Sequence, residues 1–274
     1  MPTGDFKPVP LKPHAFSFAF NLPTHHVNLF FVGDGMTNFV LPRARITSAI
    51  FLLISVLAFA KAQAQKKDSA APLLQPDKGK FSVVLEGKTI GHEEFEIAPT
   101  GAGWLARGTT TIKSEKGADT KVSGNLTLQP DGSPVAYDWS AQTDKTNGAH
   151  ILFANSIAKI TLQMQGAQPF EQDLTFGSPR IVILDNNLYY QYAVLARLYD
   201  WSKRGTQQLP VLIPQELTPG VITLESTGSA SSGGKSYEGL RVTTTDLEID
   251  LLLDTNHKLM RLEVPSARVA VVRE

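Results

Sequence analysis

The chain of 274 residues contains no cysteine, and this absence removes several chemistries at once. Disulfides, thiolate metal sites and cysteine nucleophiles are all excluded. An excess of one charge is also lacking, because 26 Lys and Arg balance 26 Asp and Glu. Five of the basic and two of the acidic residues lie within residues 1–64, which leaves residues 65–274 with a net charge of about −3. Nucleic-acid-binding proteins normally carry a basic face, so no nucleic acid is predicted as a partner.

The glycine and serine patterns of common catalytic sites are missing too. The sequence contains no G-x-S-x-G nucleophile elbow, no dinucleotide-binding fingerprint and no P-loop. The serines of 228–233, GSASSG, lack the flanking apolar strand and helix that such an elbow needs. His150 and His257 stand alone and are interpreted as surface residues. The sequence therefore predicts no cofactor and favours a protein that is not an enzyme.

Residues 36–64 have the anatomy of a secretory signal peptide. Arg43 and Arg45 form the positive region, residues 46–60 the apolar region, and Ala62-Gln63-Ala64 an A-x-A cleavage site. The apolar run is short for a membrane span of roughly 20 residues, although a retained anchor is the alternative. We expect a periplasmic or secreted protein with no stable membrane span after cleavage.

The segment before this signal, residues 1–35, is rich in Pro, Phe and His and has no clear periodicity. We interpret it as a mis-assigned start, with synthesis beginning at Met36. The alternative is a genuine disordered extension. His25 and His26 fall in this segment and are not expected to bind metal. Residues 65–79, polar and punctuated by proline, are predicted to be a linker.

From residue 80 onward, short alternating runs are separated by residues that tolerate tight turns. Connections this short join antiparallel neighbours. Residues 226–236, TGSASSGGKS with its preceding serine, are too small and polar for a core and are expected to form a flexible hairpin loop. Roughly a dozen strands are predicted, at 80–86, 89–97, 104–112, 121–129, 135–142, 151–153, 157–165, 169–176, 208–213, 221–226, 237–244, 248–253, 258–264 and 267–272.

One segment between these strands has a helical rhythm instead. Residues 186–204 are predicted to form an amphipathic helix, with Asp185 and Asn186 as N-cap candidates and Gly205 after its cationic last turn. The apolar side chains recur at spacings of three and four, at Leu188, Tyr192, Leu195, Ala196 and Tyr199. The predicted fold is a single β-rich domain over residues 80–274. Its architecture is a curved antiparallel sheet, a half-barrel or a barrel, with this helix packed against it.

The aromatic helix supplies the candidate binding site. As a lid or wall over a cavity, it would contact a hydrophobic ligand through Tyr189, Tyr192, Leu195 and Tyr199, with Leu212 in the adjacent rim. The alternative is a structural plug whose apolar stripe packs permanently on the sheet and completes the core.

The densest ionisable cluster is the run HEEFE at residues 92–96. On a strand, His92, Glu94 and Glu96 share one face and are weak candidates for a divalent-metal site. Phe95 and Ile97 point to the other face, so the favoured interpretation of the charged trio is a solvated strand face. An acid/base pair would require a carboxylate in an apolar pocket, and the pattern does not place one there.

Three stretches carry a family resemblance: 81–95 (FSVVLEGKTIGHEEF), 207–215 (QQLPVLIPQ) and 249–274 (IDLLLDTNHKLMRLEVPSARVAVVRE). They resemble exported bacterial β-sheet domains of unknown function, some of which precede an α/β-hydrolase domain in one polypeptide. The resemblance covers most of residues 80–274 and implies an exported antiparallel sheet domain. It carries over no catalytic residue.

The leading hypothesis is a non-catalytic binding or accessory module for a hydrophobic small molecule or an envelope protein. A hydrolase-associated domain with a residual enzymatic role is one alternative, which requires a pocket containing a perturbed carboxylate or His92. A structural envelope-assembly protein that binds through a sheet edge is another. That class requires a long uncovered edge strand without bulges or charges.

Overall fold

The computed structural model describes residues 72–114, 118–143, 145–244 and 247–274. The predicted signal peptide and the segment before it lie outside these residues. The described part contains fifteen strands, one α-helix and two short 3-10 helices. In chain order these are β1 Asp77–Leu85, β2 Lys88–Thr100, β3 Gly103–Ile112, β4 Thr120–Leu128, β5 Pro134–Gln142, β6 Thr146–Ala154, β7 Ile157–Met164, β8 Phe170–Thr175, β9 Val182–Ile183, α1 Tyr190–Leu198, β10 Gln207–Ile213, η1 Pro214–Glu216, β11 Thr218–Ser232, β12 Lys235–Thr243, β13 Glu248–Leu253, β14 Leu259–Val264, η2 Pro265–Ala267 and β15 Val269–Arg273.

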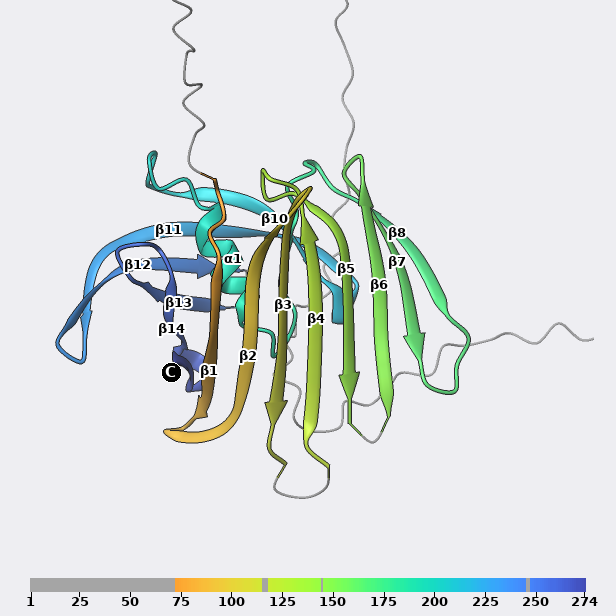
Figure 1. The fold of residues 1–274 in the computed structure, drawn as a ribbon, viewed down its shortest axis with the longest axis horizontal. Coiled ribbons are helices and arrows are strands. Elements are labelled where there is room, and N and C mark those ends of the chain that lie inside the picture. The colour runs from red at the N-terminus through yellow and green to blue at the C-terminus, as the bar shows by residue number, and fades with distance from the viewer. Residues whose placement is uncertain (1–71, 115–117, 144, 245–246) are drawn as a thin grey trace, which may run out of the picture. The chain divides into compact units, whose positions relative to one another are not determined.

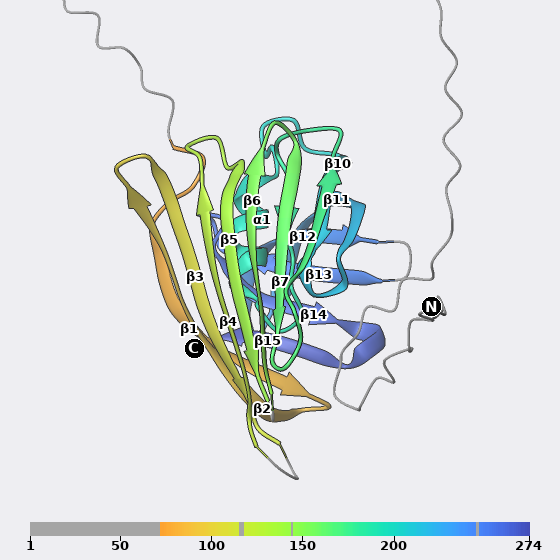
Figure 2. The ribbon, with the colours of Figure 1, turned by 90° about the vertical axis from the view of Figure 1, so that its right-hand side faces the viewer.

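All described strands belong to one curved, unclosed sheet, and the predicted fold class is confirmed. The order runs from β8 back to β1, continues through β15, and then descends from β14 to β9. Every described pair is antiparallel except β9 with β10. We call β1–β8 the first half and β9–β15 the second half. Figures 1 and 2 show the sheet folded over, with the first half on one side of α1 and β10–β14 on the other.

The two halves join where the first and last strands pair. Phe81 of β1 lies opposite Arg273 of β15, and the Arg273 guanidinium donates to the buried Asp77 carboxylate at 2.6 Å. The same guanidinium lies over the rings of Phe81 and Phe95, which stack 4.7 Å apart. Burying this ion pair requires partners for all its polar atoms, and Arg273 also donates to the Lys78 carbonyl at 3.0 Å. The C-terminal strand β15 is therefore bound to β1, the first strand in the described part of the chain.

The helix differs from its prediction in length and in burial. It spans Tyr190–Leu198 rather than 186–204. Asn187 has a left-handed φ of 66°, Tyr199 is extended, and Asp200 accepts from the Ser202 backbone N–H in a turn. Eight of its nine residues are buried, all except Arg197, because the folded sheet surrounds it.

The segment predicted as a flexible loop at 226–236 instead forms paired strand. Ser229 to Ser232 lie opposite Lys235 to Glu238 in the hairpin of β11 and β12. Gly233 and Gly234 make the turn, with φ of 57° and 73°. Residues 226–238 contain no buried side chain, so the apolar alternation that marks a half-buried strand is missing from them. Backbone pairing, rather than apolar burial, therefore defines this end of the hairpin.

Candidate functional site

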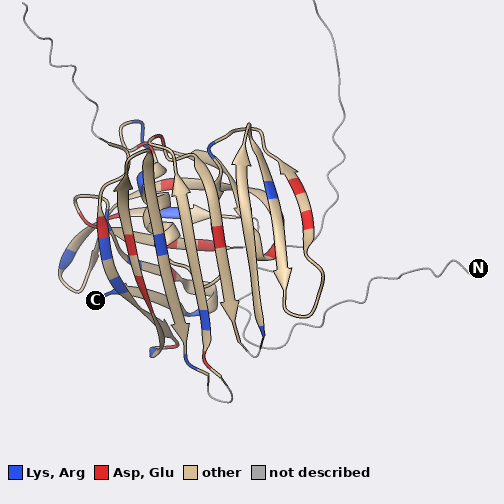
Figure 3. Cartoon of the chain, turned by 45° about the vertical axis from the view of Figure 1, so that its right-hand side comes forward, with Lys and Arg blue, Asp and Glu red and all other residues tan. Residues whose placement is uncertain are grey.

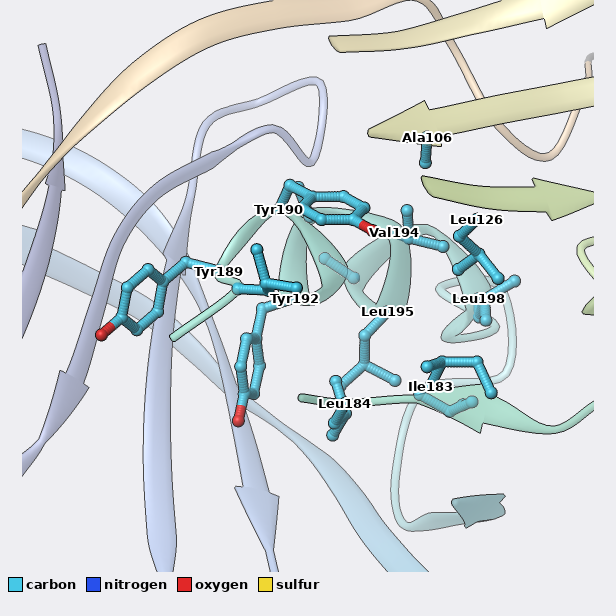
Figure 4. Packing of buried hydrophobic residues seen from close by; sticks show 14 of the residues in the cluster. Ala106, Leu126, Ile183, Leu184, Tyr189, Tyr190, Tyr192, Val194, Leu195 and Leu198 are labelled. Atoms are coloured by element: carbon cyan, nitrogen blue, oxygen red, sulfur yellow. The ribbon is translucent and has the colours of Figure 1, made fainter. Parts of the chain in front are cut away.

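The five predicted ligand contacts all lie in the core. Tyr189 is the most exposed of them, at 9%, and Tyr192, Leu195, Tyr199 and Leu212 are more deeply buried. Figure 4 shows Tyr189, Tyr192 and Leu195 among the packed side chains around α1. The structure thus brings these residues together within the hydrophobic core. Their role as ligand contacts stays a prediction.

The three weak metal candidates share the outer face of β2, as predicted, and each has its own partner. His92 Nδ1 lies 2.8 Å from Glu274 Oε1, and Glu96 accepts from Arg107 Nη2 at 2.6 Å. The Arg107 hydrogen bond lowers the pKa of Glu96. Glu94 lies 3.9 Å from the nearest lysine ammonium. Within the described residues, no three His, Asp or Glu side chains are grouped to share a metal ion.

An exposed Ser-His-Glu cluster on the same face superficially resembles a catalytic triad. The Ser82 hydroxyl donates to Glu274 Oε1 at 2.7 Å, and His92 Nδ1 lies 2.8 Å from that same oxygen. In a nucleophile relay, the hydroxyl and the carboxylate bind opposite nitrogens of the imidazole ring. Here both lie on the Nδ1 side, 3.4 Å separating Ser82 Oγ from His92 Nδ1. The hydroxyl proton points to the carboxylate, so His92 does not activate Ser82.

A buried carboxylate that sequence reasoning missed lies at the start of α1. Glu93 of β2 is fully buried, and both its oxygens lie 3.1 Å from the Tyr189 backbone nitrogen, which donates to them. Burial raises the pKa of Glu93 to about 8, against the opposing effect of hydrogen bonds from the Tyr190 and Tyr189 N–H groups. The signal was the strand period, because Glu93 has the parity of the inward Phe95 and Ile97.

Two glycines make room for the helix beside this carboxylate. Gly108 of β3 and Gly124 of β4 lie opposite one another. A Cβ on Gly108 would lie 2.5 Å from Tyr190 Cδ1 and 2.8 Å from Glu93 Oε1. A Cβ on Gly124 would lie 2.8 Å from the Tyr137 hydroxyl oxygen and 2.9 Å from that of Tyr190. The absence of both side chains lets Tyr190 rest directly on the sheet.

A second buried carboxylate, Asp185, lies between β9 and α1. Its Oδ2 accepts from the Tyr137 hydroxyl, and its Oδ1 accepts from the Gln215 N–H at 3.3 Å. Gln191 completes the cluster, donating to the Tyr137 hydroxyl at 2.9 Å and accepting from the Asp185 N–H at 2.5 Å. Burial raises the pKa of Asp185 to about 7. The hydrogen bonds from Tyr137 and Gln215 lower this pKa, and the nearby Glu216 carboxyl raises it further.

These two carboxyls have the perturbed pKa values expected of catalytic acids, but their surroundings are structural. Each is fully enclosed and is hydrogen-bonded to backbone or side chains that fix α1. Two surface hollows border the described strands, one at β5–β7 and one at β2–β4, and neither is lined by Glu93, Asp185 or His92. The combination that would favour an enzyme, a pocket with a perturbed carboxylate or His92 in it, is absent from both hollows.

The larger hollow, of about 580 Å³, lies at one end of β5–β7. It is bordered by the His150–Asp138 pair, joined at 2.6 Å between Nδ1 and Oδ1, and by the apolar Met164 and Pro169. Trp139 also lines it, and the Trp139 indole N–H is buried with no hydrogen-bond partner in the described structure. The second hollow, of about 430 Å³, lies over β2–β4 and is bordered largely by polar side chains.

Two exposed large apolar side chains, Met164 and Phe170, lie beside the larger hollow, and a third, Leu152, points to the opposite face of the sheet. Leu152 of β6, Met164 of β7 and Phe170 of β8 are 49%, 37% and 45% exposed. The fourth such residue in the described part, Val221 of β11, lies in the second half of the sheet.

Figure 3 shows basic and acidic residues interspersed over the strands of the first half. No helix in the described ranges is long and apolar enough to cross a bilayer.

Comparison with known proteins gives a limited result. No protein-family model matches the chain, and no curated protein matches it. A crystal structure of a beta-barrel-like protein of the domain of unknown function DUF1849 from Brucella abortus has a TM-score of 0.48 at 10% identity, covering 73% of this chain and 94% of that one. A DUF1089 family protein from Pseudomonas aeruginosa has a TM-score of 0.42 at 10% identity, covering 66% and 91%.

These structural neighbours are bacterial β domains of unknown function. Neither provides a site or an activity for this chain. The expected relationship to domains that precede α/β-hydrolases stays a prediction.

Proposed function

We propose that this protein is an exported, non-catalytic binding module that takes a small amphipathic molecule at the β5–β8 end of its sheet. One observation carries the proposal. Met164 and Phe170, two of the four exposed large apolar side chains in the described part, share one face of β7 and β8 beside the larger hollow, which Met164 lines. Apolar side chains gathered at one place on a surface are typical of a binding region.

The hollow has the size and the chemistry for such a ligand. Its volume of about 580 Å³ falls in the range of about 300–1,000 Å³ that is typical of small-molecule sites. Met164 and Phe170 offer apolar contact, and the His150–Asp138 pair at the border of the hollow offers polar contact. A molecule with an apolar chain or ring and one polar oxygen group satisfies both requirements.

The proposed site lies away from the helix, whereas the sequence predicted ligand contacts on the helix itself. Tyr192 and Leu195 are buried, so they contact a ligand only if α1 leaves its place in the sheet. The energetic cost of such a movement is large, because burying one Leu or Tyr side chain contributes about 1.5–3 kcal/mol. The plug interpretation of α1 is therefore preferred over the lid.

Binding through a sheet edge has less support. The edge strand β8 has only six residues, and it carries Glu171 and Asp173 on one face. Charges on a short edge strand are a common protection against strand addition. An envelope protein remains the alternative partner, and it would bind at the apolar end of β7 and β8 rather than by extending the sheet.

Export is part of the proposal and is supported by the signal-like residues 36–64. The test is cell fractionation followed by N-terminal sequencing of the mature protein. We expect a periplasmic or secreted chain that begins at Gln65. A cytoplasmic chain that retains residues 36–64 would overturn the export proposal.

The ligand proposal is tested by native mass spectrometry of the purified protein with dodecanoate and with a lipid extract of bacterial envelopes. We expect an adduct that Met164→Glu or Phe170→Glu weakens at least tenfold. Val221→Glu is the matched control, since Val221 is also exposed but lies on β11. An adduct that survives both hollow variants, or one lost equally with Val221→Glu, contradicts the proposed site.

A further inference from the structure

One buried carboxyl group connects the two halves of the sheet to the helix between them. Asp185 is bound by Tyr137 from β5 of the first half and by Gln215 from η1 of the second half. Its own N–H is bound by Gln191 from α1. These contacts connect positions 48, 30 and 6 residues apart in the chain.

The segment that carries Asp185 is held by these contacts, by the fully buried Leu188 and by the hydrogen bond from the Tyr189 N–H to Glu93. Residues 184–189 lie between β9 and α1 and belong to no strand or helix. Asn187 in this segment has a left-handed φ of 66°, which is a sparsely populated backbone conformation. Residues 185–189 can therefore move outward without breaking a pair of strands, although Leu188 is then exposed. The position of these residues depends on the side-chain hydrogen bonds and on the burial of Leu188.

The surroundings of Asp185 favour its neutral form. The groups that act on its carboxyl are the Tyr137 phenol from β5, the Tyr190 phenol from α1 and the Glu216 carboxyl from η1. Glu93 of β2 acts on Tyr190 from the other side. All of these groups are neutral or acidic. An ionised Asp185 would be a buried charge without a cation, which is strongly unfavourable.

We propose that Asp185 is a proton-controlled clasp, which holds the β9–α1 segment between the two halves when it is neutral and releases the segment to solvent when it ionises. Opening of the clasp is coupled to the loss of one proton. The cause is solvation, because water stabilises the carboxylate that the interior does not. The clasp is independent of the hollow at β5–β8 and of any ligand there.

The direction of the pH effect follows from the two states. The pKa of Asp185 is about 7 in the closed state and 3.8 when the group is solvated. The closed state is therefore most favoured below pH 4, and opening increases as the pH rises toward 7. The full effect on the opening equilibrium is up to about a thousandfold, which is the difference in pKa expressed as a ratio. Above pH 7, Asp185 adds no further change to the opening equilibrium.

Hydrogen exchange of the full chain, measured by mass spectrometry from pH 4 to pH 8.5 and corrected for intrinsic rates, tests the clasp. In the unmodified protein, we expect the opening of residues 185–189 to increase up to tenfold per pH unit between pH 4 and 7. Asp185→Asn cannot ionise and should lose this increase. Glu93→Gln should keep it, because that variant removes only the neighbouring titration. Asp138→Asn, at an exposed site next to Tyr137, is the control.

A second variant distinguishes proton control from a merely structural role. The Tyr137 hydrogen bond lowers the pKa of Asp185, so Tyr137→Phe should move the upper end of the pH window to higher pH. A structural contact alone would raise exchange equally at every pH. The same rise in Asp185→Asn as in the unmodified protein overturns the clasp. If Asp185→Asn does not fold, an unmoved window in Tyr137→Phe overturns it instead.

Discussion

At the scale of single residues, two inward positions of the sheet decide how α1 is held. Glu93 accepts hydrogen bonds from the N–H groups of Tyr189, the residue before the helix, and of Tyr190, its first residue, which the helix itself cannot satisfy. Gly108 and Gly124 supply the space for Tyr190. The prediction that no carboxylate lies in an apolar environment was wrong, although Glu93 has the strand parity of Phe95 and Ile97 and could have been placed inward with them. No local sequence pattern indicates that Glu93 binds the backbone at the start of a helix 96 residues away.

We predict that Gly124→Ala destabilises the protein by about 1–3 kcal/mol, the usual cost of overpacking a core. The new methyl carbon would lie 2.8 Å from Leu188 Cδ1 and from the Tyr137 hydroxyl oxygen. Urea denaturation followed by circular dichroism measures the effect. Gly177→Ala is the control, since no atom lies within 4 Å of its added carbon. Equal stabilities of the two variants would contradict the close packing of α1.

The pKa of Glu93 predicts how stability depends on pH. The folded protein binds the Glu93 proton up to about pH 8, whereas the unfolded chain releases it near pH 4.5. The free energy of unfolding should therefore decrease as the pH rises from 4.5 to 8, by at most about 5 kcal/mol for this group. In Glu93→Gln, urea midpoints measured across this range should decrease less. A slope identical to that of the unmodified protein would show that Glu93 is not buried in the folded state.

At the scale of elements, the sequence predicted where a helix lies better than where it ends. The apolar spacing around Tyr192 and Leu195 identified α1 correctly. The predicted caps failed because the Asp185 carboxylate is bound to Tyr137 and Gln215 rather than to the helix N-terminus. The tip of the β11–β12 hairpin was wrongly predicted to be a flexible loop. Residues 226–238 have no buried side chains, so they lack the alternation of apolar and polar residues that predicts a strand.

The plug role of α1 predicts an asymmetry between two leucines. Leu195→Ala should cost about 2–5 kcal/mol of unfolding free energy, because Leu195 is fully buried. Leu152→Ala should have little effect on stability, because Leu152 is half exposed. Chemical denaturation of the two variants gives the comparison directly. A small cost for Leu195→Ala would favour a mobile lid.

At the scale of the whole molecule, short turns predicted which strands are neighbours but left one pairing undetermined. Each hairpin follows from its turn, and the curved antiparallel sheet follows from the hairpins. The pairing of β1 with β15 joins Phe81 to Arg273 across nearly the whole described chain. Local sequence has no signal for a contact of that length, so the fold-over around α1 was found only in the structure.

The open edge of the sheet carries a prediction about self-association. Antiparallel pairing of two β8 strands places residues of one parity together, so Glu171 and Asp173 of one copy would face those of the other. We predict that the double variant Glu171→Thr, Asp173→Thr dimerises or aggregates, which light scattering measures. Replacing Glu225 and Glu248 by Thr, at exposed positions on inner strands, is the control. A monomeric edge variant would contradict charge as the protection of β8.

The central structural claim is that α1 is part of the core and that the site for a ligand lies elsewhere. Native-state hydrogen exchange of α1 in increasing urea at pH 6 tests it most directly. If α1 is a plug, its slowest amides exchange only by global unfolding, with the free energy and urea dependence of the whole domain. If these amides exchange through an opening of much lower free energy and weak urea dependence, α1 is a lid, and the binding site belongs beneath it.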